Sequence, residues 1–218
     1  MTVNGPPDRF YRIGNHLATD FVNTVYDPDH PAGSLRSARD VIAFLVATGS
    51  IDAAAATGLR RALTDGSVAK RWFERALTLR GAIAESLIAF EARRALPQAA
   101  LGHMNDVLRK AAGYESLVSR TPTAYDLQFV FVAADPAAAL APVARAAAEL
   151  LANSRSRVRK CAHPECVRHF VDDSRTSRRR WCEMAVCGNR AKVTAFLERK
   201  RSVTAKHTSR MDKQTRPR

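Results

Sequence analysis

The sequence predicts an α+β protein, with a mainly helical N-terminal domain that contains a small antiparallel β element and with a compact cysteine-bearing module behind it. Three observations carry this prediction. Apolar residues recur at helical spacing through most of the first 112 residues. Residues 125–132 are rich in aromatic and β-branched side chains, as strands are. All four cysteines lie in the last third of the 218-residue chain, which is long enough for one core and a small second unit.

Capping and breaking residues divide the N-terminal part into elements. Asn15 is expected to cap the first helix, in which Leu17, Phe21 and Val25 share one apolar face. Pro97 ends a long fourth helix. A strand at 125–132 is expected to pair with residues 114–119. The helices are expected over residues 16–25, 37–49, 52–63, 67–96, 98–112 and 142–151.

The net charge of +14 is concentrated at one end of the chain. Residues 151–218 hold 19 Lys and Arg against 6 Asp and Glu, which leaves the first 150 residues close to neutral. Clustered cations favour a polyanionic partner, because they displace counterions from phosphates. A solvated basic tail without a partner is the alternative. No apolar run is long enough for a membrane span or a signal peptide, so we expect a cytoplasmic protein without a membrane partner.

The cysteines form two close pairs, Cys161 with Cys166 and Cys182 with Cys187. Two C-x4-C pairs separated by fifteen residues suit one tetrahedral zinc ion held by four thiolates. Such a closed site is structural, because no position is left for water or substrate. Two disulfides or an iron–sulfur cluster are the alternatives, and His163 and His169 are further ligand candidates. Residues 169–171 and 179–181 are expected to form a hairpin and residues 191–201 a helix, in a treble-clef-like zinc finger.

At these residues the chain resembles a known family. Phe170 to Arg175, Arg179 to Met184 and Cys187-Gly188-Asn189-Arg190 are similar to the CGNR zinc finger, and Gly14 to Thr24 is similar to the opening of the ABATE domain, with Thr19 where Leu is usual. The resemblance implies that the protein is a stress-induced transcription regulator. In such a protein, the finger is expected to bind DNA and the ABATE domain a small ligand. The expected units are residues 10–153, the finger at 157–201 and a disordered basic tail at 202–218.

The basic residues of the module are the candidate nucleic-acid contacts. They lie on the expected second hairpin arm and along the final helix: Arg178, Arg179, Arg180, Arg190, Lys192, Arg199 and Lys200. Arg190 is placed to reach a base edge, with bonding to backbone carbonyls as the alternative. Trp181 is expected to pack beneath the zinc, and Asp172 and Asp173 to cap the turn.

The N-terminal domain offers one candidate ligand site. Asp20 and Asn23 belong to a polar stripe on the first helix, which lines a ligand pocket or is simply the solvated face. No catalytic motif stands out, so we predict a DNA-binding regulator rather than an enzyme, and we expect a homodimer. A zinc-stabilised RNA-binding or protein-interaction module is the alternative.

Overall fold

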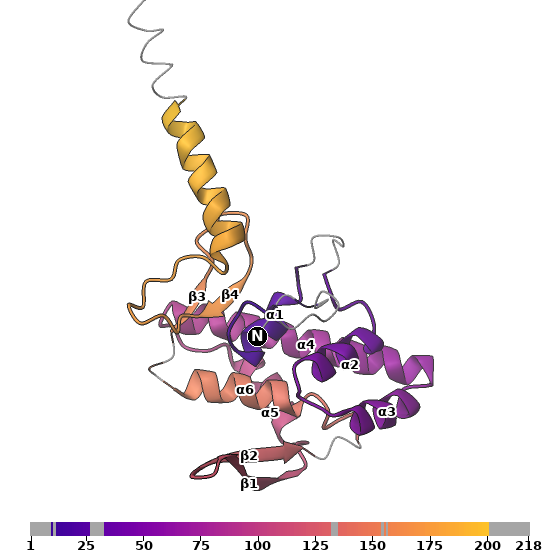
Figure 1. Cartoon of the computed structure of the whole chain (residues 1–218). Helices are drawn as coiled ribbons and strands as arrows, with labels where there is room; N and C mark the ends of the chain where they lie inside the picture. The colour runs from indigo at the N-terminus through magenta and orange to yellow at the C-terminus, as the bar shows by residue number, and fades with distance from the viewer. Residues whose placement is uncertain are drawn as a thin grey trace, which may run out of the picture.

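The computed structural model describes residue 10 and residues 12–26, 33–131, 135–153, 155 and 157–200. Helices form the body of the molecule, with a β-hairpin below it and the cysteine-bearing end above it in Figure 1. The predicted α+β class, mainly helical with small antiparallel sheets, is confirmed. The tail predicted over residues 202–218 lies outside the described residues.

Six α-helices are described in the body. Aspartate caps explain where the third and the fourth of them begin. The Asp52 carboxylate accepts from the Ala55 backbone N–H at 2.7 Å, and Asp65 accepts from the backbone N–H of Ser67 and Val68. The helices are α1 (Leu17–Asn23), α2 (Ala38–Ala47), α3 (Ala53–Ala62), α4 (Gly66–Glu91), α5 (Gln98–Leu108) and α6 (Ala141–Ala152).

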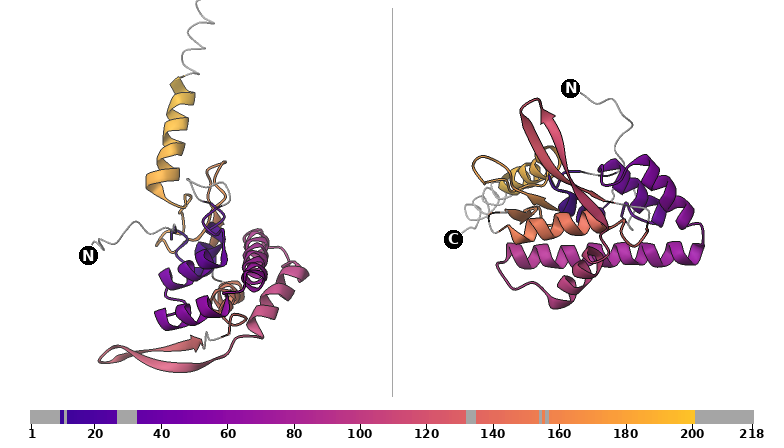
Figure 2. Two further views of the ribbon diagram at one scale, coloured as in Figure 1. Left: turned by 90° about the vertical axis from the view of Figure 1, so that its right-hand side faces the viewer. Right: turned by 90° about the horizontal axis from the view of Figure 1, so that it is seen from below.

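The hydrophobic core lies along one face of α4. Leu79, Ile83 and Leu87 recur at helical spacing on that face and are buried. Phe21 of α1 and Phe44 of α2 meet above it, with ring centroids 5.4 Å apart, and α6 runs alongside α4 (Figure 2). Full burial of each such side chain contributes about 1.5–3 kcal/mol, so this core holds α1 firmly in place.

The first helix differs from its prediction at both ends. Asn15 is not the cap: its φ is 59°, and the His16 side chain accepts from the Ala18 backbone N–H instead. The helix stops at Asn23, so Val25 leaves the apolar face and is 46% exposed. The helical spacing of apolar residues extends to Val25, although the backbone leaves the helix after Asn23.

The predicted pairing of residues 114–119 is confirmed with residues 125–130, and residue 132 of the predicted strand lies outside the described residues. Strands β1 (Gly113–Thr121) and β2 (Ala124–Phe131) form an antiparallel hairpin in which Leu117 lies opposite Leu127. The hairpin extends outward beneath the helices (Figure 2). Tyr114, Leu117 and Tyr125 are all more than half exposed on it.

A second, smaller sheet corrects the predicted hairpin of the cysteine module. Strand β4 (His169–Val171) pairs with β3 (Val158–Lys160), not with residues 179–181. The two strands flank the loop that carries Cys161 and Cys166, so this loop closes the hairpin. The other segment makes a single backbone bond to the loop, from Ala162 N–H to the Arg180 carbonyl.

A helix ends the described chain and projects from the body (Figure 1). It begins as a single π turn, η1 (Met184–Gly188), which carries Cys187, and continues over residues 189–200. Most of the helix predicted over 191–201 is therefore confirmed. Within the described part of the chain, no helix has both the length and the apolar character needed to cross a bilayer.

Candidate metal centre and nucleic-acid interface

The four cysteine sulfurs converge on one point. All four Sγ atoms lie within 4.8 Å of one another, and three of the four residues are buried. The Sγ of Cys182 is 3.8 Å from that of Cys166 and 3.6 Å from that of Cys187. Four sulfurs at about 2.3 Å from one zinc ion lie ~3.8 Å apart in a tetrahedron. The donor set and its spacing therefore fit one zinc ion, and the cysteines are free rather than joined in disulfides.

The thiols of this cluster oppose one another's ionisation when no cation lies between them. The hydrogen bond with Cys166, together with burial, raises the pKa of Cys182. Burial and the neighbouring Cys182 raise the pKa of Cys187 to about 11. A divalent cation would reverse this preference, because it stabilises the thiolates that coordinate it. Without a cation, these pKa shifts favour the neutral thiols, unlike the lowered pKa of a reactive cysteine.

Asp172 organises the loop between the two cysteine pairs. Its carboxylate, 1% exposed, accepts from the backbone N–H groups of Ser174 and Arg179 and from the Arg159 guanidinium at 3.1 Å. Burial alone would raise the pKa of this carboxyl, but the bonds from Ser174, Arg159 and Arg179 outweigh it and lower the pKa. The predicted turn-capping role understated Asp172, which also ties the loop to β3.

Arg179 is half-buried and bonds to the backbone of the module and of the N-terminal segment. Its guanidinium donates to the backbone carbonyls of Ile13 (3.0 Å), Trp181 (3.0 Å) and Cys182, and lies 4.4 Å from the centre of the Phe170 ring. Its Nε and Nη2 donors are thus bonded to backbone acceptors. This arginine joins the cysteine module to the N-terminal segment, and its predicted contact with nucleic acid stays a prediction.

The Asn23 side chain both donates and accepts a hydrogen bond at the same contact between the cysteine module and the N-terminal part. Its side-chain Nδ2 donates to the His169 carbonyl at 2.8 Å, and its Oδ1 accepts from the His169 N–H at 2.8 Å. Asn23 is 2% exposed, so both bonds are shielded from water. Asp20 accepts from the Gly14 N–H at 2.7 Å. Both side chains hold backbone in place, and the predicted ligand role of Asp20 and Asn23 stays a prediction.

The segment before α1 completes this junction. The Gly14 carbonyl accepts from the Val171 N–H at 2.8 Å, and the exposed Asn15 side chain donates to Asp173 at 3.0 Å. A side chain at Gly14 would collide with Thr19 and with Asp20, whose Oδ1 would lie 2.8 Å away. Val158 and Val171 also pack with the helical core. The cysteine module is thus built onto the helical body.

Comparison with known families agrees with this geometry. The model of the CGNR zinc finger matches residues 157–200. The model of the ABATE family, described as "Putative stress-induced transcription regulator", matches residues 15–154, more than half of the chain. The chain belongs to the ABATE family. No curated relative matches it. The predicted ABATE–CGNR architecture is therefore confirmed, together with a four-cysteine cluster that could coordinate one zinc ion.

Two histidines near the CGNR cluster take no part in it. His163 accepts through Nδ1 from the Glu165 N–H at 3.3 Å. His169 is 4% exposed, and burial lowers its pKa. Neither histidine belongs to the sulfur cluster, so four cysteines suffice for the ABATE protein's metal site.

Arg168 is the residue of the CGNR finger that sequence reasoning missed. It is 4% exposed, its guanidinium lies 4.1 Å from the centre of the Tyr26 ring, and Nη1 lies 3.9 Å from the Cys182 Sγ. A cation beside thiolate ligands stabilises their charge. Only its position two residues after Cys166 could have drawn attention to it.

The remaining predicted nucleic-acid residues of the CGNR finger reach solvent. Arg178, Arg180, Arg190 and Lys192 are exposed, and none has a carboxylate partner among the described residues. Arg180 lies 5.1 Å from the centre of the half-buried Trp181 ring. Arg199 and Lys200 are exposed at the far end of the projecting helix. The structure therefore brings the loop arginines together near the sulfur cluster and leaves the helix residues along a free arm.

Proposed function

We propose that this ABATE protein is a DNA-binding transcription regulator in which Cys161, Cys166, Cys182 and Cys187 ligate one structural zinc ion. The proposal rests mainly on one observation. Exposed cations without carboxylate partners lie on a small module whose two cysteine pairs converge on one point. Four thiolates complete the tetrahedron, which favours a structural over a catalytic ion. A guanidinium that has no carboxylate partner is available to a phosphate.

Arg178 and Arg180 are the residues we assign to phosphate contact in the finger loops, with Arg190 and Lys192 at the start of the final helix. Arg178 and Arg180 line an open hollow of about 620 Å³ that also contains Trp181 and Met184. An aromatic ring beside cations suits a sugar–phosphate backbone, whose sugars and phosphates it can contact together. Arg199 and Lys200 would extend the contact along the duplex.

Replacing Arg178 and Arg180 together by glutamine should weaken binding to duplex DNA. Loss of two phosphate contacts lowers the slope of log K against log salt by about 2, because fewer counterions are released. Fluorescence anisotropy on a short duplex over roughly 50–200 mM salt measures both quantities. The matched control is Arg60→Gln with Arg61→Gln, which removes the same charge from the exposed end of α3.

The outcomes of this experiment distinguish DNA binding by these loops from RNA binding and from binding of another partner. An unchanged affinity and slope in the Arg178/Arg180 variant would exclude these loops as the DNA surface. Tighter binding of structured RNA than of duplex DNA at equal salt would favour the RNA-binding alternative. If neither nucleic acid binds, the charge serves another partner and the regulatory assignment fails.

We also propose that the helical domain senses a small zwitterionic molecule. A cavity of about 540 Å³ lies between α1, the α2–α3 loop, β2 and α6, within the usual size of ligand sites. Arg145, Asp52 and Glu149 supply both charges to its lining, and Phe129 supplies an aromatic face. Arg145 lies 4.5 Å from the centre of that ring. Arg145 donates to Glu149 at 2.8 Å in the free protein. A ligand with an ammonium and a carboxylate would exchange this exposed ion pair for one bond to each of its own charges.

Millimolar amino acids should include one that raises the melting temperature of the wild-type chain. Ala146→Trp should abolish that rise, because Ala146 lines the cavity and a tryptophan would fill it. Differential scanning fluorimetry of both proteins makes the comparison. Stabilisation of the variant to the same degree would place the ligand elsewhere, and no response to any amino acid would remove the zwitterion proposal.

A further inference from the structure

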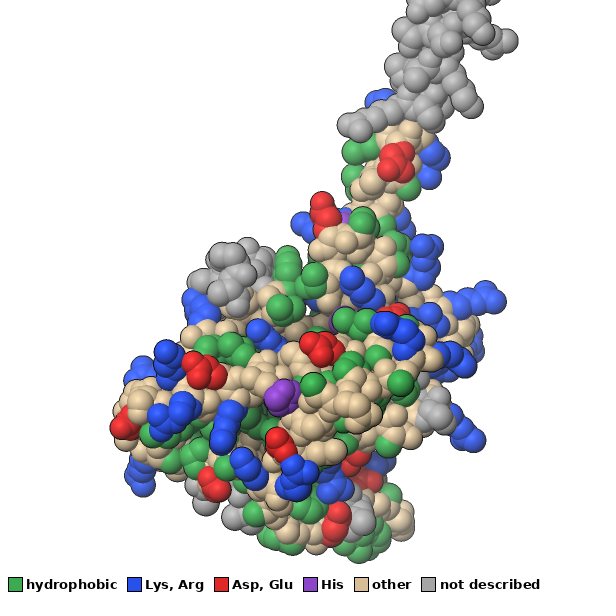
Figure 3. Space-filling view, turned by 180° about the vertical axis from the view of Figure 1, so that it is seen from behind, with side chains coloured by type: hydrophobic (Ala, Val, Ile, Leu, Met, Phe, Trp, Pro, Cys, Tyr) green, Lys and Arg blue, Asp and Glu red, His purple; other side chains and the backbone are tan. Residues whose placement is uncertain are grey.

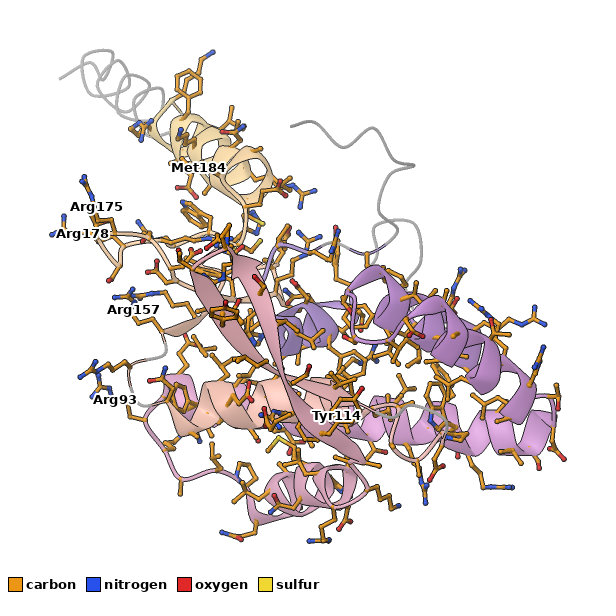
Figure 4. The ribbon with its side chains drawn as sticks, turned by 60° about the horizontal axis from the view of Figure 1, so that its bottom comes forward. Arg93, Tyr114, Arg157, Arg175, Arg178 and Met184 are labelled. Carbon is orange, nitrogen blue, oxygen red and sulfur yellow. The ribbon has the colours of Figure 1, made fainter. Side chains whose placement is uncertain are left out.

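A row of arginines continues from the finger onto the helical body. We call Arg93, Arg155, Arg157, Arg175 and Arg178 the basic edge. Arg93, Arg157, Arg175 and Arg178 all point outward on the same side of the molecule in Figure 4. Arg155 belongs to the connection between α6 and β3, two residues before Arg157, and is exposed. Figure 3 shows Lys and Arg gathered along the side of the finger with few acidic groups among them.

Hydrogen bonds join the parts of the basic edge. The Glu91 carboxylate, near the end of α4, accepts from the Lys160 N–H at 3.0 Å, which places Arg93 beside β3. Arg157, directly before β3, donates from Nε to the Asp172 carbonyl at 3.0 Å. Asp172 in turn begins the loop that carries Arg175 and Arg178. The edge is therefore continuous in space although its residues come from distant parts of the sequence.

The charges of the basic edge are not neutralised. None of its five arginines has a carboxylate partner in the described ranges. Exposed arginines on the hairpin and its neighbouring helices behave differently: Arg109 pairs with Asp106, Arg120 with Asp126, and Arg145 with Glu149. Like charges on such a surface repel one another in the free protein. A polyanion that covers the surface relieves this repulsion, which favours binding.

Arg93 has an unusual backbone conformation for its residue type. Its φ is 53°, in the left-handed region that non-glycine residues enter at a cost of about 1–2 kcal/mol. Its N–H bonds to the Phe90 carbonyl and that of Arg94 bonds to the Ala89 carbonyl, which ends α4 and turns the Arg93 side chain outward. A cation also stabilises a helix C-terminus. A test of Arg93 must therefore read binding and not only stability.

We propose that the basic edge extends the DNA surface from the finger loops onto the end of α4 and the α6–β3 connection. This inference rests on the proposed function. The backbone from Arg157 to Lys160 alone spans about 10 Å in extended form, whereas phosphates along one strand repeat at ~3.4 Å of helix axis. The edge is thus long enough to follow several phosphates. The helical domain is then part of the DNA-binding surface rather than a remote sensor.

The variant that tests the inference is Arg93→Asn with Arg155→Gln. Asparagine tolerates positive φ, so the turn at the end of α4 is retained. Binding to a short mixed-sequence duplex should weaken about tenfold near physiological salt, and the slope of log K against log salt should fall by about 2. Arg60→Gln with Arg61→Gln removes equal charge from α3, at the opposite end of the body from the finger (Figure 1), and should change the slope by well under 1.

The outcomes separate this inference from the proposed function. If Arg178→Gln with Arg180→Gln reduces binding while the Arg93/Arg155 variant binds as wild type, the inference is overturned and the finger keeps its assignment. Equal losses in the Arg93/Arg155 and Arg60/Arg61 variants would also overturn it, because net charge alone would then explain the effect. A wild-type protein that binds no DNA would contradict the proposed function itself. Thermal unfolding of each variant verifies that it is folded.

Discussion

Replacing Cys182 by serine should abolish stoichiometric zinc binding and lower the melting temperature of the whole chain. Cys182 is 1% exposed and its sulfur lies closest to those of Cys166 and Cys187, so its loss opens the centre of the cluster. Structural zinc supplies about 10–16 kcal/mol in small finger peptides, which is comparable with the total stability of a domain. Without the ion, β4 loses its support from the finger while remaining bonded to Asn23 of α1.

Zinc content by atomic absorption and thermal unfolding by circular dichroism measure the two effects. Glu165→Ser is the matched control, because Glu165 is exposed in the loop between Cys161 and Cys166 and is no ligand candidate in the cluster. Zinc affinity should also fall as pH falls, because the raised pKa of Cys187 means that binding must displace protons. One zinc ion retained per Cys182→Ser chain would contradict the four-thiolate site, and an unchanged melting temperature would contradict the coupling.

Replacing Asn23 by alanine should destabilise the protein by about 3 kcal/mol. The change leaves the N–H and the carbonyl of His169 buried without partners, and each such group costs roughly 1–3 kcal/mol. Urea unfolding should show a lower midpoint with an unchanged dependence on denaturant.

The comparison for Asn23→Ala is Asp173→Ala, which removes another hydrogen bond across the same junction. Asp173 accepts from Asn15 in an exposed position, so water replaces the lost partner and the cost should stay below about 1 kcal/mol. Equal effects of the two substitutions would mean that the burial of Asn23 does not matter. An Asn23→Ala protein as stable as wild type would show that the module is held by other contacts.

Much of the fold could be predicted because its signals are local. Helical spacing of apolar residues placed α4 and α5, and the paired cysteine spacing placed the metal cluster. The predicted end of α4 at Pro97 is wrong: α4 ends at Glu91, and Pro97 instead precedes the first residue of α5. The partner of β4 could not be read in this way. Residues 158–160 and 179–181 both flank cysteines, and the choice depends on Asp172 and Arg179, whose buried contacts no spacing reveals.

The roles of polar residues were harder to predict for the same reason. Asp20 and Asn23 were recognised as a polar stripe, but a stripe looks alike whether it faces water, a ligand or another part of the chain. Asn23 meets a backbone 146 residues away. Arg179 and Arg178 are adjacent in sequence, yet one lies inside the junction and the other reaches solvent. Such differences follow from tertiary contacts alone.

The contacts of Ile13, Gly14 and Asn23 with the finger affect how the chain can fold during synthesis. These residues leave the ribosome first, whereas their bonding partners around His169, Val171 and Arg179 emerge about 150 residues later. At usual elongation rates of about 5–20 residues per second, α1 waits on the order of ten seconds or more with its polar side uncovered. A chain released before residue 169 lacks all of these partners and would keep that surface open.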